Sequence, residues 1–142
     1  MFVREAMTSN VLTATPTTPI SQVARDMASQ DVGTAVIVEG SRPVGIVTDR
    51  DIVINHVAKG HFHDCPVSEA MTGSTMIASL VTISPNSDIL DAARELGRQR
   101  VGRLLVVEND KLLGILSAGD VTRELKKALD GLLTEGEKAD KS

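Results

Sequence analysis

The same succession of apolar patterns, helical spacing followed by a continuous aliphatic run, occurs twice along the chain. Apolar residues recur every three or four positions over residues 20–27 and again over residues 89–96, which predicts two amphipathic helices. Each helix is followed by a continuous aliphatic run, at residues 35–38 and 104–107. Such runs are typical of strands that are buried on both faces.

A second apolar run follows each of these strands after a short polar turn, and it ends in a repeated motif. The motif is Gly, two aliphatic residues, Thr or Ser, two variable residues and Asp, at residues 45–51 and 114–120. Short extended segments precede the helices at residues 12–13 and 81–82. The chain is therefore predicted to have an α/β (α+β) fold of two β-α-β-β-α repeats, packed with pseudo-twofold symmetry.

The repeats set the expected domain boundaries. We expect repeat 1 at residues 1–60, a linker at 61–66, repeat 2 at 67–130 and a polar, disordered tail at 131–142. A unit of about 60 residues is marginally stable alone. The two copies are therefore expected to pack sheet face to sheet face, with two equivalent clefts between them.

Composition narrows the possible partners. The 142 residues carry a net charge of −4, and Phe2 and Phe62 are the only aromatic residues, so neither charge nor base stacking favours nucleic acid. A single cysteine, Cys65, fits a reducing compartment. No apolar run is long enough to cross a membrane, and the N-terminus lacks a secretory signal. We expect a cytoplasmic protein.

The Thr/Ser-x-x-Asp part of the motif has two interpretations. The hydroxyl of Thr48 or Ser117 can cap a helix, with Asp51 or Asp120 at the third position. Alternatively, unpaired N–H groups at a helix N-terminus suit phosphate, and a carboxylate can accept hydrogen bonds from the two hydroxyls of a ribose. Arg50 adds positive charge at the first motif. Both interpretations can hold together, because one hydroxyl can cap a helix and contact a ligand.

From about residue 3 to residue 129, the doubled pattern resembles a tandem pair of CBS domains, also called a Bateman module. The resemblance rests on Ala-Met-Thr at residues 6–8 and 70–72, Val-Gly at 32–33 and 101–102, and the two Gly-to-Asp motifs. It implies a stand-alone, non-enzymatic sensor that binds AMP, ADP, ATP, NAD(H) or S-adenosylmethionine as a regulatory ligand. It also implies a homodimer.

In that family each site is shared between the repeats, and the resemblance implies two composite sites here. The first consists of Thr48, Arg50, Asp51, Thr72, Val81, Val101, Gly102 and Arg103. The second consists of Ser117, Asp120, Thr8, Leu12, Val32 and Gly33. Arg103 stands where relatives often bind phosphate, and a surface ion pair is its alternative role. Its counterpart is Thr34, so we expect the two sites to differ.

The three histidines and the cysteine lie within ten positions, between the copies. His61, His63 and Cys65 alternate, so on an extended segment they could face one way, and imidazole and thiolate suit Zn²⁺ or copper. Their spacing matches no familiar structural zinc pattern, which favours a solvated linker.

Three functional hypotheses follow. The first is the adenosine sensor, the second is a protein-interaction module with vestigial ligand sites, and the third is a metal- or redox-responsive protein. No histidine lies next to the motifs and no nucleophile–base pair is evident, so we expect no enzyme.

Overall fold

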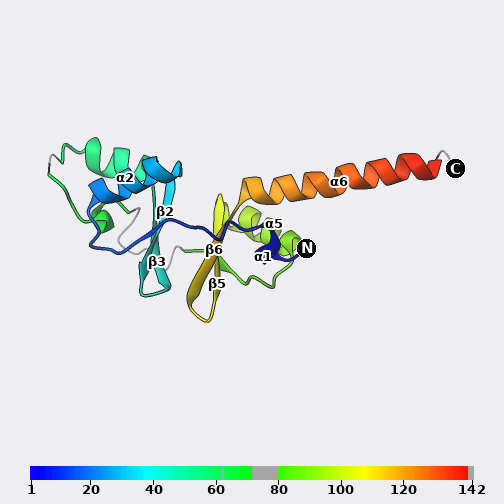
Figure 1. Ribbon diagram of the computed structural model, residues 1–142, viewed down its shortest axis with the longest axis horizontal. Coiled ribbons are helices and arrows are strands. Elements are labelled where there is room, and N and C mark those ends of the chain that lie inside the picture. Colours follow the sequence, from blue (N-terminus) through cyan, green and yellow to red (C-terminus); the bar gives the residue numbers. More distant parts are fainter. Residues whose placement is uncertain (62, 72–79, 141–142) are drawn as a thin grey trace. The chain divides into compact units, whose positions relative to one another are not determined.

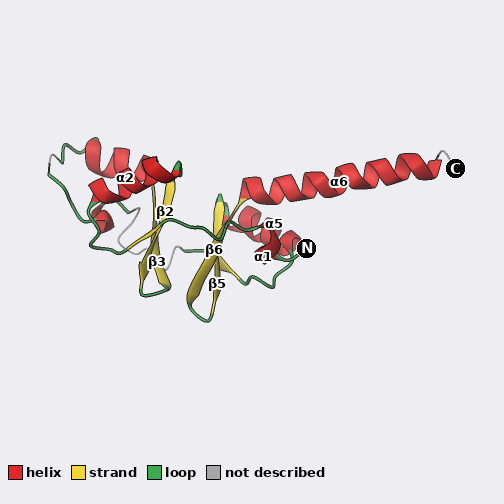
Figure 2. Ribbon diagram, in the orientation of Figure 1, coloured by secondary structure: helices red, strands yellow, loops and turns green. Residues whose placement is uncertain are grey.

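The computed structural model describes residues 1–61, 63–71 and 80–140, and confirms a mixed α/β fold that contains the same elements twice (Figures 1 and 2). The first series is α1 (Val3–Ala6), β1 (Thr13–Ala14), α2 (Ile20–Gln30), β2 (Thr34–Glu39), β3 (Arg42–Thr48), α3 (Asp49–Ile52) and the π-helix η1 (Val53–Val57). The second series is the 3₁₀-helix η2 (Val67–Glu69), β4 (Thr82–Ile83), α5 (Ile89–Gln99), β5 (Arg103–Glu108), β6 (Lys111–Ser117) and α6 (Ala118–Asp140).

Each series builds a three-stranded sheet, in the orders β1-β2-β3 and β4-β5-β6. The first strand of each sheet runs parallel to the second, and β2 pairs antiparallel with β3 in a hairpin. The central strands are buried, with Ile37 and Leu104 both 0% exposed. The prediction of strands buried on both faces is therefore confirmed.

The helical stripes predicted from the apolar spacing face the cores. On α2 the buried side chains are Ile20, Val23 and Met27, and on α5 they are Ile89, Ala92 and Leu96.

The chain divides into two compact units whose boundaries differ from those of the predicted repeats. The first-repeat unit comprises residues 9–80 and 107–113, and the second-repeat unit comprises residues 1–8, 81–106 and 114–142. Each opening segment thus lies with the core of the other repeat. The N–H of Val3 donates to Ser87 O at 2.8 Å, and the N–H of Val67 donates to Thr18 O at 2.8 Å. Each unit therefore contains the opening segment of the other repeat.

Helix α6 continues through Asp140, where the polar composition predicted a disordered tail over residues 131–142. The physical reason is that polarity does not oppose a helix. The segment is rich in Leu, Ala, Glu and Lys, all of which favour helix, and the hydroxyl of Thr134 donates to Asp130 O at 3.0 Å. In Figure 1, α6 begins beside α5, and its later turns extend beyond α5. Among the described helices, none combines the length and apolar character that crossing a bilayer requires.

Candidate functional site

The two Thr/Ser-x-x-Asp motifs close into the same hydrogen-bonded structure. In the first, Asp51 N–H donates to Thr48 Oγ1 at 3.1 Å and Thr48 N–H donates to Asp51 Oδ2 at 2.9 Å. In the second, Ser117 and Asp120 make both bonds at 3.0 Å. The capping interpretation is confirmed at both positions: each motif joins the end of a strand to the start of a helix and fixes a half-buried carboxylate there.

The first motif offers no N–H group to a phosphate, which corrects one expectation from the sequence. Asp49 N–H donates to Gly33 O at 2.9 Å, and Arg50 N–H donates to Asp49 Oδ1 at 2.8 Å. Together with the capping box, these bonds use all four N–H groups from Thr48 to Asp51. The strand–helix turn is satisfied by its own side chains, so a phosphate here would need side-chain cations.

Both Val-Gly pairs lie beside the motif of their own repeat. Gly102 O accepts from Ala118 N–H at 2.9 Å, as Gly33 O does from Asp49. A side chain at Gly33 would place its Cβ 3.0 Å from Asp49 Oδ2. A cavity of about 360 Å³ opens at this point, lined by Met27, Ala28, Asp31, Val32, Gly33 and Asp49.

The cations of the predicted first site remain available. Both Arg50 and Arg103 are exposed, and within the described part of the chain no ion pair engages either guanidinium. The surface ion pair considered for Arg103 is therefore not found. At the second motif, by contrast, Arg123 Nη1 lies 3.3 Å from Asp120 Oδ1.

The remaining predicted residues occupy both units. Leu12 O accepts from Val36 N–H at 2.9 Å in the first-repeat unit, and Val81 O accepts from Leu105 N–H at 3.0 Å in the second-repeat unit. Thr8 belongs to the second-repeat unit, and Thr72 lies outside the described residues. Each predicted composite site draws on both units, and its full composition stays a prediction.

The first glycine of each motif, Gly45 or Gly114, permits a close approach of another segment. A Cβ at Gly114 would lie 2.7 Å from Thr8 O, and Thr8 exchanges two backbone hydrogen bonds with Ile115 at 2.9 Å. At Gly45 the neighbour is the side chain of Met71. Met7 and Thr8 thus pack directly on β6, and Met71 packs on β3.

A second group of chemically active side chains lies apart from these motifs. The ligand atoms of His56, His61 and Cys65 all lie within 4.8 Å of one another. The sequence pattern grouped His63 with His61 and Cys65, but its ring centroid lies 6.3 Å from that of His61. His56 takes its place because the chain reverses at Gly60, which has φ of 72°. The sequence signal for this turn was the glycine at position 60, five residues before Cys65.

Comparisons with known proteins agree with this architecture. The family model for the CBS domain matches residues 3–55 and 67–127. The CBS domain-containing protein YhcV of Bacillus subtilis is 34% identical over 119 residues, covering 84% of this chain and 81% of YhcV.

Two solved structures share the fold. The CBS domain protein PAE2072 from Pyrobaculum aerophilum, complexed with AMP, is 25% identical with a TM-score of 0.71, covering 89% of this chain and 99% of that one. The CBS domain pair of protein MJ0100, in complex with 5′-methylthioadenosine and S-adenosyl-L-methionine, is 19% identical with a TM-score of 0.74, covering 90% and 98%. At that identity the second likeness concerns the fold alone.

Proposed function

Because this chain belongs to the CBS domain family, we propose that it is a non-enzymatic regulatory module that binds an adenosine-type ligand. The candidates are AMP, ADP, ATP, NAD(H) and S-adenosylmethionine, and AMP comes first because the similar protein PAE2072 is complexed with AMP. The observation that carries the proposal is the doubled capping box, which fixes an aspartate carboxylate at the same point of each repeat.

The fixed carboxylates are the proposed ribose receptors. Asp51 is half-buried, and its bond to Thr48 N–H sets its position. An ionised carboxylate has about four acceptor positions, so it can hold its helix and accept from a pair of vicinal hydroxyls. A carboxylate that is already positioned loses little side-chain entropy when the ligand binds.

Because only the proposed first site carries Arg50 and Arg103, we expect the two sites to bind different ligands. In the proposed first site Arg50 and Arg103 would bind phosphate through their guanidinium groups, which suit phosphate oxygens better than a lysine does. The second site has Thr34 and Gly119 at the corresponding positions. The first site is therefore proposed to take the phosphorylated nucleotide, and the second an adenosine compound with less negative charge.

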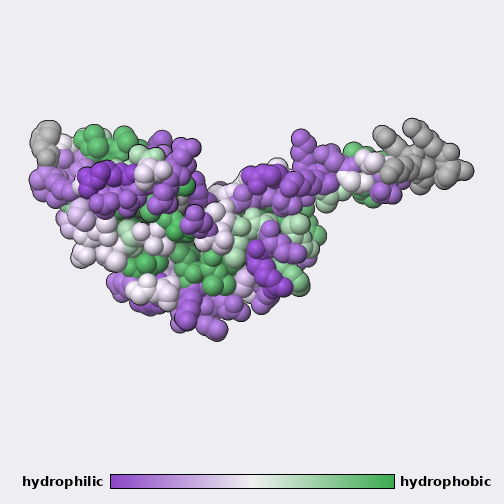
Figure 3. All heavy atoms as spheres, viewed as in Figure 1, coloured by the Kyte–Doolittle hydropathy of each residue, from purple (hydrophilic) through white to green (hydrophobic). Residues whose placement is uncertain are grey.

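Regulation would act through a homodimer. The side chains of Val53, Ile54 and Val57 on α3 and η1 are 56%, 43% and 61% exposed, and Figure 3 shows hydrophobic atoms on the outer surface of this region. This face begins directly after the Thr48–Asp51 motif. A ligand held by that motif can shift the assembly only if it binds one arrangement of the subunits more tightly than another.

Differential scanning calorimetry with AMP, ATP, NADH or S-adenosylmethionine tests the proposal. A ligand at about 100 times its Kd adds about 2.7 kcal/mol to the free energy of unfolding, which raises Tm by roughly 10 °C for a domain of this size. Adenosine and inorganic phosphate, tested separately, divide the effect between the ribose and phosphate contacts. If Tm is unchanged with every ligand, the proposal fails and the protein-interaction module with vestigial sites becomes the better account.

A further inference from the structure

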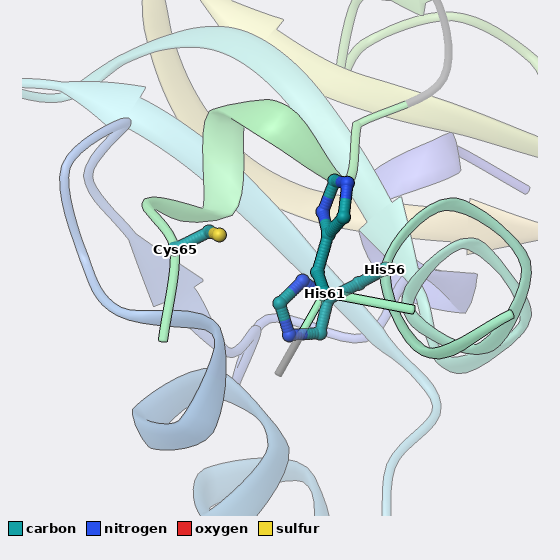
Figure 4. A group of neighbouring side chains, drawn as sticks. All are labelled: His56, His61 and Cys65. Atoms are coloured by element: carbon teal, nitrogen blue, oxygen red, sulfur yellow. The ribbon is translucent and has the colours of Figure 1, made fainter. Parts of the chain in front are cut away.

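The side chains of His56, His61 and Cys65, here called the His/Cys cluster, meet within the first-repeat unit. Figure 4 shows the Cys65 sulfur pointing toward the two imidazole rings, with His56 on η1 and the other two residues on the segment that follows. We propose that this cluster binds one Zn²⁺ ion through the Cys65 sulfur and one nitrogen of each histidine.

Backbone hydrogen bonds hold the three ligands in place. His61 N–H donates to His56 O at 3.3 Å, and Cys65 O accepts from Ile20 N–H at 2.9 Å. The first bond ties one histidine to the other, and the second fixes the cysteine at the start of α2. The two imidazole rings meet edge to face, with centroids 5.5 Å apart. Such a site costs little entropy to assemble, because its ligands are already ordered.

One buried nitrogen of the cluster has no hydrogen-bond partner in the described part of the chain. His56 Nδ1 is buried and has no hydrogen-bond partner among the described residues. Buried polar atoms of native proteins are nearly always paired, and an exception calls for an explanation such as an ion. The histidine also lies on a π-helix, a rare element that often marks a functional position. Both features are explained if the ring is a metal ligand.

The surrounding charge favours a cation. The carboxylates of Glu69 and Asp64 lie near the Cys65 side chain. The same negative groups would stabilise a divalent ion. Asp64 is a neighbour in this account and not a ligand, because its two carboxylate oxygens accept from the N–H and the hydroxyl of Ser21. When the sulfur coordinates the ion, its proton passes to solvent.

The distances require only a small contraction. Tetrahedral Zn²⁺ with nitrogen and sulfur ligands places those atoms roughly 3.3–3.6 Å apart, against an upper limit of 4.8 Å here. Side-chain rotation can supply the difference. A cavity of about 330 Å³ beside the cluster, lined in part by His56, His61 and His63, gives the ion access. Three protein ligands leave the fourth position for water.

The test uses the full chain, stripped of metal with chelator and then titrated with Zn²⁺ in competition with a chromophoric chelator. Co²⁺ is titrated in parallel, because a bound thiolate gives a sulfur-to-cobalt charge-transfer band. We expect about one Zn²⁺ per chain and this band in the wild-type protein. Cys65→Ser should abolish the band, and His56→Ala or His61→Ala should each weaken Zn²⁺ binding by about 100-fold or more, since even residues that only support a ligand account for 10–100-fold.

His63→Gln is the matched control, because it removes a histidine from the same cavity but outside the cluster, and it should change the affinity less than about threefold. Circular dichroism in chelator checks that each variant folds. If Cys65→Ser fails to fold, the loss of Zn²⁺ affinity in His61→Ala tests the same site. The proposal is overturned if the wild-type chain binds less than about 0.1 equivalent of either metal, if the charge-transfer band survives in Cys65→Ser, or if His63→Gln weakens binding as much as His61→Ala does.

Discussion

Asp51 and Asp120 each hold the start of a helix with one carboxylate oxygen, and the proposed function assigns ribose binding to the same carboxylates. The two roles can be separated by chemistry. Asn keeps an oxygen that can accept from the Thr48 N–H but removes the negative charge. Ala removes both.

We therefore expect Asp51→Asn to leave the free energy of unfolding within about 0.5 kcal/mol of wild type while weakening nucleotide binding by about 10- to 100-fold. Asp51→Ala should lose binding and also about 1 kcal/mol of stability. Urea denaturation followed by circular dichroism, together with calorimetric titration, measures both. Normal binding by the Asn variant, with loss only in the Ala variant, would show that the carboxylate acts solely as a cap.

Gly114 gives a second test at this scale. A Cβ there would meet Thr8 O at 2.7 Å and the Met7 sulfur at 2.8 Å, so Gly114→Ala should lower the free energy of unfolding by about 1–3 kcal/mol. Gly97, within helix α5, is the matched control, because nothing lies within 4 Å of its Cβ position. Gly97→Ala should be neutral or stabilising by up to about 1 kcal/mol. Equal effects of the two changes in urea denaturation would contradict the close packing of the Ala-Met-Thr segment on β6.

The chemistry of single residues was only partly predictable from sequence. The capping box could be read from Thr48-x-x-Asp51 because its partners are three residues apart. The sequence could not show that the neighbouring N–H groups are already hydrogen-bonded, because Asp49 N–H donates to Gly33 O, sixteen residues earlier in the chain. Likewise, the pairing of His61 with His56 depends on the turn at Gly60, and alternation along the chain pointed to His63.

At the scale of elements, helix α5 carries an ion pair whose pH dependence can be stated. The pKa of Glu95 is lowered by side-chain hydrogen bonds, first from Arg98 and then from Gln99. Arg98 Nη2 lies 2.7 Å from Glu95 Oε2. A carboxyl group whose pKa is lower in the folded state than in the unfolded state stabilises the fold at pH values above the unfolded pKa, which is about 4.3 for Glu. That stabilisation is lost as the pH falls through the folded pKa.

Glu95→Gln should therefore be less stable than wild type at pH 7, and the difference should disappear at pH values well below about 4.3. Glu108→Gln on the exposed end of β5 is the control. Urea denaturation at several pH values measures the difference. A gap that widens on acidification would contradict this assignment of the Glu95 pair.

The β-α-β-β-α order of each repeat followed directly from the sequence, because helical spacing and continuous aliphatic runs are local patterns. The grouping of the elements into units did not, because residues 1–8 join the second repeat through contacts such as Val3 N–H to Ser87 O. Helix α6 was missed over its last turns for a different reason. The sequence reasoning treated a polar segment as unable to pack, whereas residues 131–140 form helix, with residues 131–136 exposed.

At the scale of the whole molecule, the proposed homodimer uses the exposed apolar face of α3 and η1. Val57→Glu places a charge on that face and should shift the protein from dimer to monomer, with little effect on the fold because the side chain is 61% exposed. Size-exclusion chromatography with light scattering measures the mass.

Leu132 on α6, 68% exposed, provides the comparison. Leu132→Glu should leave the dimer intact. A dimer that survives Val57→Glu but dissociates with Leu132→Glu would place the interface on α6 instead.

The measurement that tests the account most directly is isothermal titration calorimetry with AMP, on the wild-type chain and on the double variant Asp51→Asn, Asp120→Asn. The chain contains no Trp or Tyr, so heat is a better signal than intrinsic fluorescence. The account predicts a saturable isotherm with one or two sites per wild-type chain, and loss of that isotherm in a double variant that folds normally by circular dichroism. The account would be contradicted if the wild-type chain gave no binding heat with AMP, ATP, NADH or S-adenosylmethionine. It would also be contradicted if the double variant gave the same isotherm as the wild type.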